Sequence, residues 1–292
     1  MIIILDATIN NWINCWNFAI DDDFFTSDIQ QAENWNKRAE DFGKDVEEDR
    51  QRKKNIDFFN LLEKIGFNPF GARILDIGCG PGTLSIPLAK AGAQVTSLDI
   101  SSGMLDRLKE IAERDNLPIT TVECSWWTAD IDELGFRNAF DLVIASFTPG
   151  IRDVETFNRM TACSRGFCYY SNFIRKDPAK IPCKIYTQIL GNLPRDNIFA
   201  AGFMYPFMYL YTLGFRPVVN ITHKSEDRDQ SWDEAAEKAI NFLLLRQNLT
   251  DDEKEKIRDY YRYSSIDGRY LTHSELFKGM MIWDIRDKNI RT

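Results

Sequence analysis

Residues 73–90, RILDIGCGPGTLSIPLAK, decide the fold. An apolar run typical of a buried strand is followed by glycines at positions 78, 80 and 82, and the segment continues with helical spacing. Glycine adopts backbone angles closed to other residues and lets a ligand approach the main chain without meeting a Cβ atom. A helix that begins just beyond such a turn offers free N–H groups. The segment therefore predicts a strand, a glycine turn that cradles a cofactor, and a helix over roughly 82–92.

The alternation of an apolar strand with a helix continues toward the C-terminus. Continuous apolar strands that alternate with helices are typical of a parallel sheet covered on both faces. The sequence therefore predicts a doubly wound, mostly parallel α/β sheet. Further predicted strands cover 94–100, 119–124, 140–147 and 166–173, and the helices between them cover about 102–115 and 153–163.

The flanking segments are predicted to be helical elaborations of a single domain over 1–292. Residues 1–70 would form an N-terminal helical lid, 71–174 the cofactor-binding core, and 175–292 the substrate-side helices and last strands, with a helical insertion before the final strand. In this last part the expected helices are 179–193, 201–215 (broken near Pro206), 231–247 and 250–264, and the expected strands are 216–224 and 278–285.

Composition excludes several classes of function. The net charge of −8 should repel nucleic acid and anionic membranes. The six cysteines form no Cys-x-x-Cys pair and there are only two histidines, so no metal site is expected. No basic leader and no apolar run of membrane-spanning length is evident, so a cytoplasmic protein is expected. A monomer and a homodimer both remain open.

The spacing of the glycines narrows the choice of cofactor. A dinucleotide fingerprint, G-x-G-x-x-G, needs its third glycine where this chain has Thr83. Asp76 to Gly82 instead reads D-x-G-x-G-x-G, which resembles motif I of the class I S-adenosylmethionine-dependent methyltransferases. The resemblance implies a Rossmann-like sheet of seven strands with an antiparallel last strand, and S-adenosyl-L-methionine as the cofactor. An NAD(P)-dependent oxidoreductase and a non-catalytic protein that only binds S-adenosylmethionine or S-adenosylhomocysteine remain the alternatives.

Asp99, at the end of the second predicted strand, can accept hydrogen bonds from both ribose hydroxyls of an adenosyl group. Asp76 is the candidate partner of the methionine amino group. The remaining positions follow from the resemblance: Ile100, Ser101 and Met104 at the adenosyl group, the loop with Ser125, Trp126 and Trp127 at the adenine edge, Ala145 and Ser146 beneath the methyl group, Trp35 and Arg38 on a helix folded over the cofactor, and the turn residues Gly78, Cys79, Gly80, Gly82 and Thr83. Three alternatives stay open: either Ser101 or Ser102 caps the helix, one of Trp126 and Trp127 belongs to the core, and Arg38 meets either the cofactor carboxylate or Asp76.

The acceptor is predicted to be a small molecule. After the fourth strand the chain lacks the N-P-P-Y type of motif used by related enzymes that methylate bases or glutamine amides. Methyl transfer from a sulfonium is an in-line displacement, so a general base is optional and depends on the acceptor atom. His223 and Tyr170 are the candidates for such a base. Whether the acceptor atom is oxygen, nitrogen, sulfur or carbon stays open.

Overall fold

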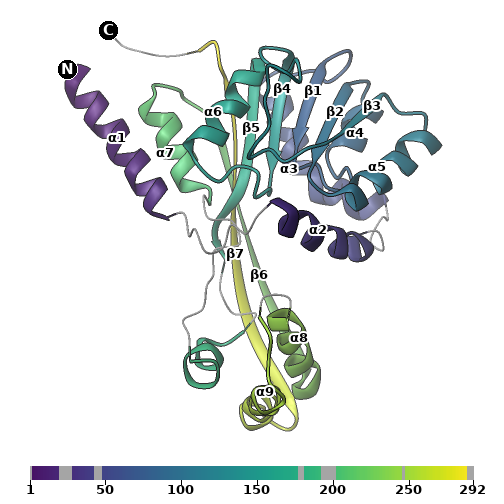
Figure 1. Cartoon of the computed structure of the whole chain (residues 1–292), viewed down its shortest axis with the longest axis vertical. Helices are drawn as coiled ribbons and strands as arrows, with labels where there is room; N and C mark the ends of the chain where they lie inside the picture. The colour runs from purple at the N-terminus through teal and green to yellow at the C-terminus, as the bar shows by residue number, and fades with distance from the viewer. Residues whose placement is uncertain are drawn as a thin grey trace. The chain divides into compact units, whose positions relative to one another are not determined.

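A mostly parallel sheet forms the centre of the computed structural model, which describes residues 2–19, 28–42, 48–176, 181–191, 202–244 and 247–287. Among these residues the sheet has seven strands in the order β3-β2-β1-β4-β5-β7-β6 (Figure 1). The strands are β1 (Arg73–Ile77), β2 (Gln94–Asp99), β3 (Ile119–Glu123), β4 (Phe140–Ser146), β5 (Ser164–Lys176), β6 (Val218–Ser231) and β7 (Arg269–Asp284).

Strands β1 to β5 run in one direction. β1 pairs in parallel with β2 and β4, β2 with β3, and β4 with β5. β7 runs against β5, because the N–H of Ile285, just past the end of β7, donates to the carbonyl of Gly166 near the start of β5 (2.9 Å). The predicted doubly wound sheet with an antiparallel last strand is confirmed. The strand order reverses at β1 and β4, and open α/β sheets bind ligands at the carboxyl ends of such strands.

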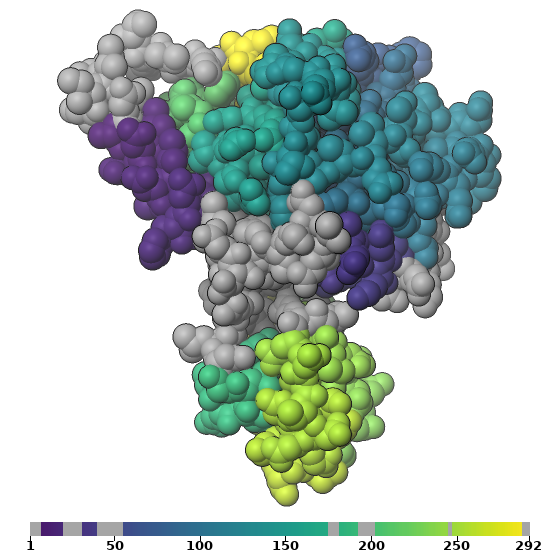
Figure 2. Space-filling model, viewed as in Figure 1, coloured from purple at the N-terminus to yellow at the C-terminus, as the bar shows by residue number. Residues whose placement is uncertain are grey.

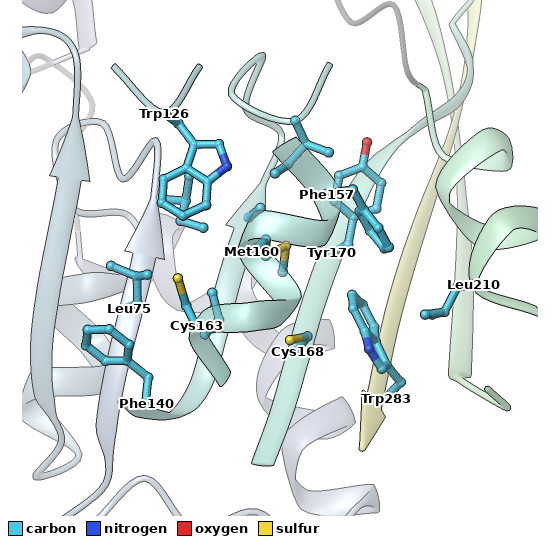
Figure 3. Packing of buried hydrophobic residues seen from close by; sticks show 14 of the residues in the cluster. Leu75, Trp126, Phe140, Phe157, Met160, Cys163, Cys168, Tyr170, Leu210 and Trp283 are labelled. Carbon is cyan, nitrogen blue, oxygen red and sulfur yellow. The ribbon is translucent and has the colours of Figure 1, made fainter. Parts of the chain in front are cut away.

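Helices cover both faces of the sheet because strand side chains alternate between two apolar clusters. Leu75 and Tyr170 belong to the cluster packed by α6, α7 and α1, whereas Ile74 and Tyr169 belong to the cluster packed by α3 and α4. In the first cluster the ring of Phe157 on α6 stacks on Trp283 of β7 at 5.5 Å (Figure 3). The helices of this part are α1 (Ile2–Ala19), α2 (Asp28–Phe42), α3 (Glu48–Lys64), α4 (Ser85–Lys90), α5 (Ser102–Arg114), α6 (Val154–Cys163) and α7 (Met204–Thr212).

The chain divides into two compact units where the sequence predicted one domain. Unit 1 comprises Met1–Ile174, Ile198–Ile221 and Gly279–Thr292, and unit 2 comprises Arg175–Asn197 and Thr222–Lys278. The difference arises because β6 and β7 are longer than the strands predicted at 216–224 and 278–285. Their additional residues belong to unit 2, which has its own apolar cluster.

Unit 2 is built around two helices, α8 (Trp232–Leu244) and α9 (Asp251–Tyr263). Their buried faces meet through residues such as Ala239, Ile257 and Tyr261. Thr250 caps α9, and Glu253 completes the capping box, which satisfies N–H groups that a helix start leaves without a partner. Figure 2 shows the outer surface that α8 and α9 contribute, in yellow-green.

Two predicted helices need correction. Residues 201–215 do not break at Pro206, because α7 begins at Met204 and the proline lies in its first turn, where an N–H has no helical partner. Among the described residues of 179–193 the helical stretch is only 183–189, most of which is the π-helical turn η2 (Ile185–Ile189). Of the predicted lid, 20–27 and 43–47 lie outside the described residues.

Candidate cofactor site

The glycine turn follows β1 and is anchored to β2. The N–H groups of Gly78 and Cys79 both donate to the carbonyl of Leu98, at 2.7 and 3.1 Å. Gly78 has a φ of +64°, and a Cβ atom there would lie 2.7 Å from the Cβ of Thr148. No side chain fits in that space, and the φ value itself favours glycine. The turn therefore needs glycine at position 78 for both conformation and packing.

Asp99 lies at the carboxyl end of β2 with its carboxylate directed at the turn. One oxygen accepts the N–H of Gly80 (2.8 Å) and the other accepts the N–H of Ser101 (2.9 Å). Burial raises the pKa of Asp99 above its usual value, and the main-chain N–H groups of Ser101, Gly80 and Ile100 offset only part of that rise. A carboxylate has about four acceptor positions, so two remain for further donors. Asp99 is thus held rigidly while it keeps the capacity to bind a pair of hydroxyls.

Asp76 is more deeply buried than Asp99, and fewer hydrogen-bond donors stabilise its ionised carboxylate. Its carboxylate accepts the hydroxyl of Ser85 (2.6 Å), which in turn accepts the hydroxyl of Ser97 (2.8 Å). Burial, and to a smaller extent the nearby charge of Asp99, raise the pKa of Asp76 to about 7. The predicted contact of Asp76 with the methionine amino group stays a prediction.

The other predicted turn residues have structural roles in this geometry. The buried thiol of Cys79 donates to the carbonyl of Gly80 (3.4 Å), and burial raises its pKa well above the usual value, which keeps it neutral. The carbonyl of Thr83 accepts the side-chain amide of Asn55 (2.7 Å). Asn55, on α3, was missed in the sequence because it belongs to a segment 28 residues away.

Helix α2 carries the predicted cofactor residues Trp35 and Arg38. The guanidinium of Arg38 lies 5.0 Å from the centre of the Trp35 ring. Asp76 accepts the hydroxyl of Ser85, and the predicted contact of Arg38 with the cofactor carboxylate or with Asp76 stays a prediction. α2 packs on α5 (Figure 1), and its predicted position over the cofactor stays a prediction.

The loop after β2 contains the predicted adenine contacts. Ser101 caps α5, as expected, by accepting the N–H of Met104 (3.2 Å). Met104 is only 2% exposed and packs in the interior. Ile100, half-buried, remains the better candidate of the two for the adenine. Both assignments to the adenine stay predictions.

Trp126 takes the core position that the sequence left open for one of the two tryptophans after β3, and the predicted adenine contact of Trp127 stays a prediction. The indole N–H of Trp126 donates to the carbonyl of Thr156 (3.1 Å) in the core, and that of Trp127 donates to the carbonyl of Pro149 (3.1 Å). Neither N–H group is therefore left for an adenine. Trp127 is half-buried with the guanidinium of Arg152 at 4.7 Å from its ring centre, and the hydroxyl of Ser125 accepts its main-chain N–H (3.3 Å).

The carboxyl ends of β4 and β5 hold the predicted methyl-side residues together with several that the sequence did not indicate. Ala145 is fully buried, and the hydroxyl of Ser146 lies 2.9 Å from that of Ser171. Phe147 has a φ of +49°, a conformation rare for an aromatic residue and frequent at functional sites. Its ring lies 5.0 Å from that of Phe173. This aromatic pair was missed because its geometry depends on the fold of two strands.

The two candidate bases, Tyr170 and His223, both contact other residues of the chain. Tyr170 is fully buried, and its hydroxyl donates to the carbonyl of Gly202 (2.7 Å) and accepts the amide of Asn172 (2.8 Å). Burial raises the pKa of Tyr170 well above 10, which opposes action as a base. His223 belongs to unit 2, where its ring stacks on Phe277 at 4.3 Å. Its role as a base stays a prediction.

The described residues contain no group of three or more side chains arranged to hold a metal ion. No described helix combines the length and apolar character that a membrane span requires.

Comparison with known proteins identifies the segment that carries the turn and Asp99. Residues 74–165 match the family described as "Methyltransferase domain". This segment is a methyltransferase domain. The methyltransferase domain spans β1 to the start of β5.

Relatives of the methyltransferase domain differ in how much of the chain they share. An uncharacterized protein of Haemophilus influenzae is 23% identical over 215 residues, which cover 73% of this chain and 76% of that protein. The ubiquinone biosynthesis O-methyltransferase of Shewanella halifaxensis is 49% identical over 84 residues, 29% of this chain and 34% of that enzyme. The chain therefore spans only about a third of that enzyme's length.

One solved structure supports the fold of the methyltransferase domain. A protein of Bacillus halodurans superposes with a TM-score of 0.50 at 13% identity, over 76% of this chain and 96% of that chain. At this identity the likeness concerns the arrangement of the elements.

Proposed function

We propose that the chain transfers a methyl group from S-adenosylmethionine to a small-molecule acceptor. The observation that carries this proposal is the Asp99 carboxylate, which is fixed by Gly80 and Ser101 at the carboxyl end of β2. Beside it the turn is open at Gly80, where a Cβ atom would meet nothing within 4 Å. A ligand with adjacent hydroxyls fits a carboxylate in this position.

The charges of the site fit a cationic cofactor. The hydrogen-bond partners of Asp76 and Asp99 in the described part of the chain are a hydroxyl and main-chain N–H groups, not basic side chains. Buried carboxyl groups without a cation are costly. When bound, S-adenosylmethionine supplies a methyl group that is already activated by the positive charge on its sulfur.

The residues of the chain then have two tasks. Asp99 would hold the ribose through two charge-assisted hydrogen bonds, each contributing roughly 1.5–3 kcal/mol. The carboxyl ends of β4 and β5 would hold the acceptor in line with the methyl group, at about 3–3.5 Å, and exclude water. This reaction requires no covalent intermediate.

Two observations favour a small-molecule acceptor with an apolar part. Phe147 and Phe173 form an aromatic pair at the ends of β4 and β5, where the acceptor side of the site is expected. The net charge of −8 disfavours nucleic acid. Several relatives of the domain are named ubiquinone biosynthesis O-methyltransferases, so hydroxyl groups are the first acceptors to test.

The experiment is a transfer assay with methyl-labelled S-adenosylmethionine and the full chain. Separate reactions receive a metabolite extract, a protein extract and nucleic acid, with Asp99→Ala as the control. Label in a small-molecule product, absent with the variant, is the expected result. Label only in a macromolecule would contradict the acceptor class. Binding of S-adenosylhomocysteine without transfer to any of the three would favour a non-catalytic binding protein.

A further inference from the structure

The side-chain amide oxygen of Asn36 on α2 forms two hydrogen bonds with the start of α5. The amide oxygen of Asn36 accepts the hydroxyl of Ser101 (2.6 Å) and the main-chain N–H of Gly103 (3.0 Å). Both bonds cross a sequence distance of more than 60 residues. Because a main-chain N–H can only donate, the oxygen of Asn36 must be the atom that faces α5.

The close approach of the two helices depends on the small residue at position 103. A Cβ atom on Gly103 would lie 3.3 Å from the Cβ of Ala39 and 3.4 Å from the amide oxygen of Asn36. Ala39 is buried in this contact, and Asn36 is half-buried. The helices therefore touch directly, with the polar anchor of Asn36 at the contact.

Ser101 connects this anchor to the carboxylate of the cofactor site. Its main-chain N–H donates to Asp99 (2.9 Å), while its hydroxyl accepts the N–H of Met104 (3.2 Å) and donates to Asn36. Asp99 in turn accepts the N–H of Gly80 in the glycine turn (2.8 Å). A continuous series of hydrogen bonds thus runs from α2 through Ser101 and Asp99 to the turn.

We propose that Asn36 is a positioning residue for the cofactor, which acts through Ser101 to fix the orientation of the Asp99 carboxylate and to hold α2 beside it. This inference rests on the proposed role of Asp99 in cofactor binding. Without the amide of Asn36, the hydroxyl of Ser101 and the N–H of Gly103 lose their acceptor. The loop that carries Asp99 then has more conformational freedom. Because binding must order this loop, the affinity for the cofactor is lower.

The test is a calorimetric titration of the full chain with S-adenosylhomocysteine. Asn36→Ala is expected to weaken binding roughly tenfold, the effect of losing about 1.4 kcal/mol of hydrogen bonding. Asn36→Asp keeps an oxygen in the same place and is expected to restore affinity to within about threefold of the unchanged chain. Asn34→Ala is the matched control, since Asn34 is an exposed residue of the same type on the same helix.

The outcomes separate this inference from the proposed function. If the unchanged chain binds and Asp99→Ala does not, but Asn36→Ala binds as tightly as Asn34→Ala, the positioning role is overturned. Failure of Asn36→Asp to restore affinity lost in Asn36→Ala also overturns it. If Asp99→Ala binds as well as the unchanged chain, the assignment of the cofactor site itself is wrong. Thermal unfolding of the ligand-free variants verifies that each is folded.

Discussion

The two units place their ionisable groups in opposite ways. Unit 1 buries Asp76 and Asp99 side by side, where both have raised pKa values. Unit 2 carries both histidines of the chain on exposed strands, each facing a carboxylate: the ring nitrogens of His223 and His273 lie 3.5 and 2.7 Å from Glu275 and Asp227.

This contrast indicates where the binding chemistry lies. A buried carboxyl group without a basic partner destabilises a fold and is frequent at functional sites. An exposed pair of opposite charges contributes only about 0–1 kcal/mol and is screened by salt. Unit 1 therefore has the features of a ligand site, whereas the charges of unit 2 are those of a solvated surface.

The largest expected effect is on cofactor affinity. Asp99→Ala removes the acceptor proposed for both ribose hydroxyls, and loss of roughly 3 kcal/mol or more would weaken binding of S-adenosylhomocysteine about 100-fold. Glu275→Ala, which removes a carboxylate from unit 2, is expected to leave affinity unchanged. Calorimetry measures the affinity of both variants for S-adenosylhomocysteine. An equal loss of affinity in the two variants would contradict the assignment of the ligand site to unit 1.

Substitution of one glycine in each unit, Gly78 and Gly268, compares the two units by their effect on stability. Gly78→Ala introduces a Cβ atom 2.7 Å from the Cβ of Thr148 at a φ of +64°. Backbone strain of about 1–2 kcal/mol and overpacking of about 1–3 kcal/mol should lower the free energy of unfolding.

Gly268→Ala is the matched control for this substitution. Gly268 has a φ of +74° but no atom within 4 Å of an added Cβ. Only the backbone strain is therefore expected there, which urea unfolding can measure. A loss at Gly268 equal to that at Gly78 would show that the contact with Thr148 is unimportant.

The pH dependence of stability tests the buried carboxyl pair. Between about pH 4 and 7 the folded chain keeps a proton on Asp76 that the unfolded chain has lost, since burial raises its pKa from 3.8 to about 7. The contribution of this group to the free energy of unfolding therefore falls as pH rises, by on the order of 2 kcal/mol from pH 5 to pH 8.

Asp76→Asn isolates this effect because the amide cannot ionise, yet its oxygen can still accept the hydroxyl of Ser85. The difference in stability between the variant and the unchanged chain should grow in favour of the variant from pH 5 to pH 8. Urea unfolding at the two pH values measures it. A constant difference would mean that Asp76 is ionised throughout this range.

The smallest effect is expected at His223. In the described part of the chain the ring of His223 contacts Phe277 and Glu275, which belong to unit 2, so His223→Ala should change the affinity for S-adenosylhomocysteine less than twofold. The same variant also tests the predicted base. Unchanged binding with lost methyl transfer would support that role for His223, whereas full transfer would exclude it.

The sequence was sufficient for the part of the fold that local signals specify. The segment 73–90 predicted β1 and the glycine turn, and the residues after it predicted β2 and the position of Asp99 at its end, because apolar runs and glycine spacing act over a few residues. The class I methyltransferase fold followed from the same short motif.

The parts that were missed depend on contacts between distant segments. The amide of Asn36 meets Ser101 65 residues away, and no local pattern indicates that contact. The indole N–H groups of Trp126 and Trp127 donate to carbonyl groups of Thr156 on α6 and Pro149 on the loop before it. The division into two units was missed because the polar ends of β6 and β7, such as residues 224–230, have no continuous apolar run.

The most direct test of the central claim is a calorimetric titration of the full, unchanged chain with S-adenosylhomocysteine. Saturable binding is expected at a single site per chain, with a dissociation constant in the micromolar range or tighter. Absence of binding heat across several temperatures, with the protein folded throughout, would contradict it.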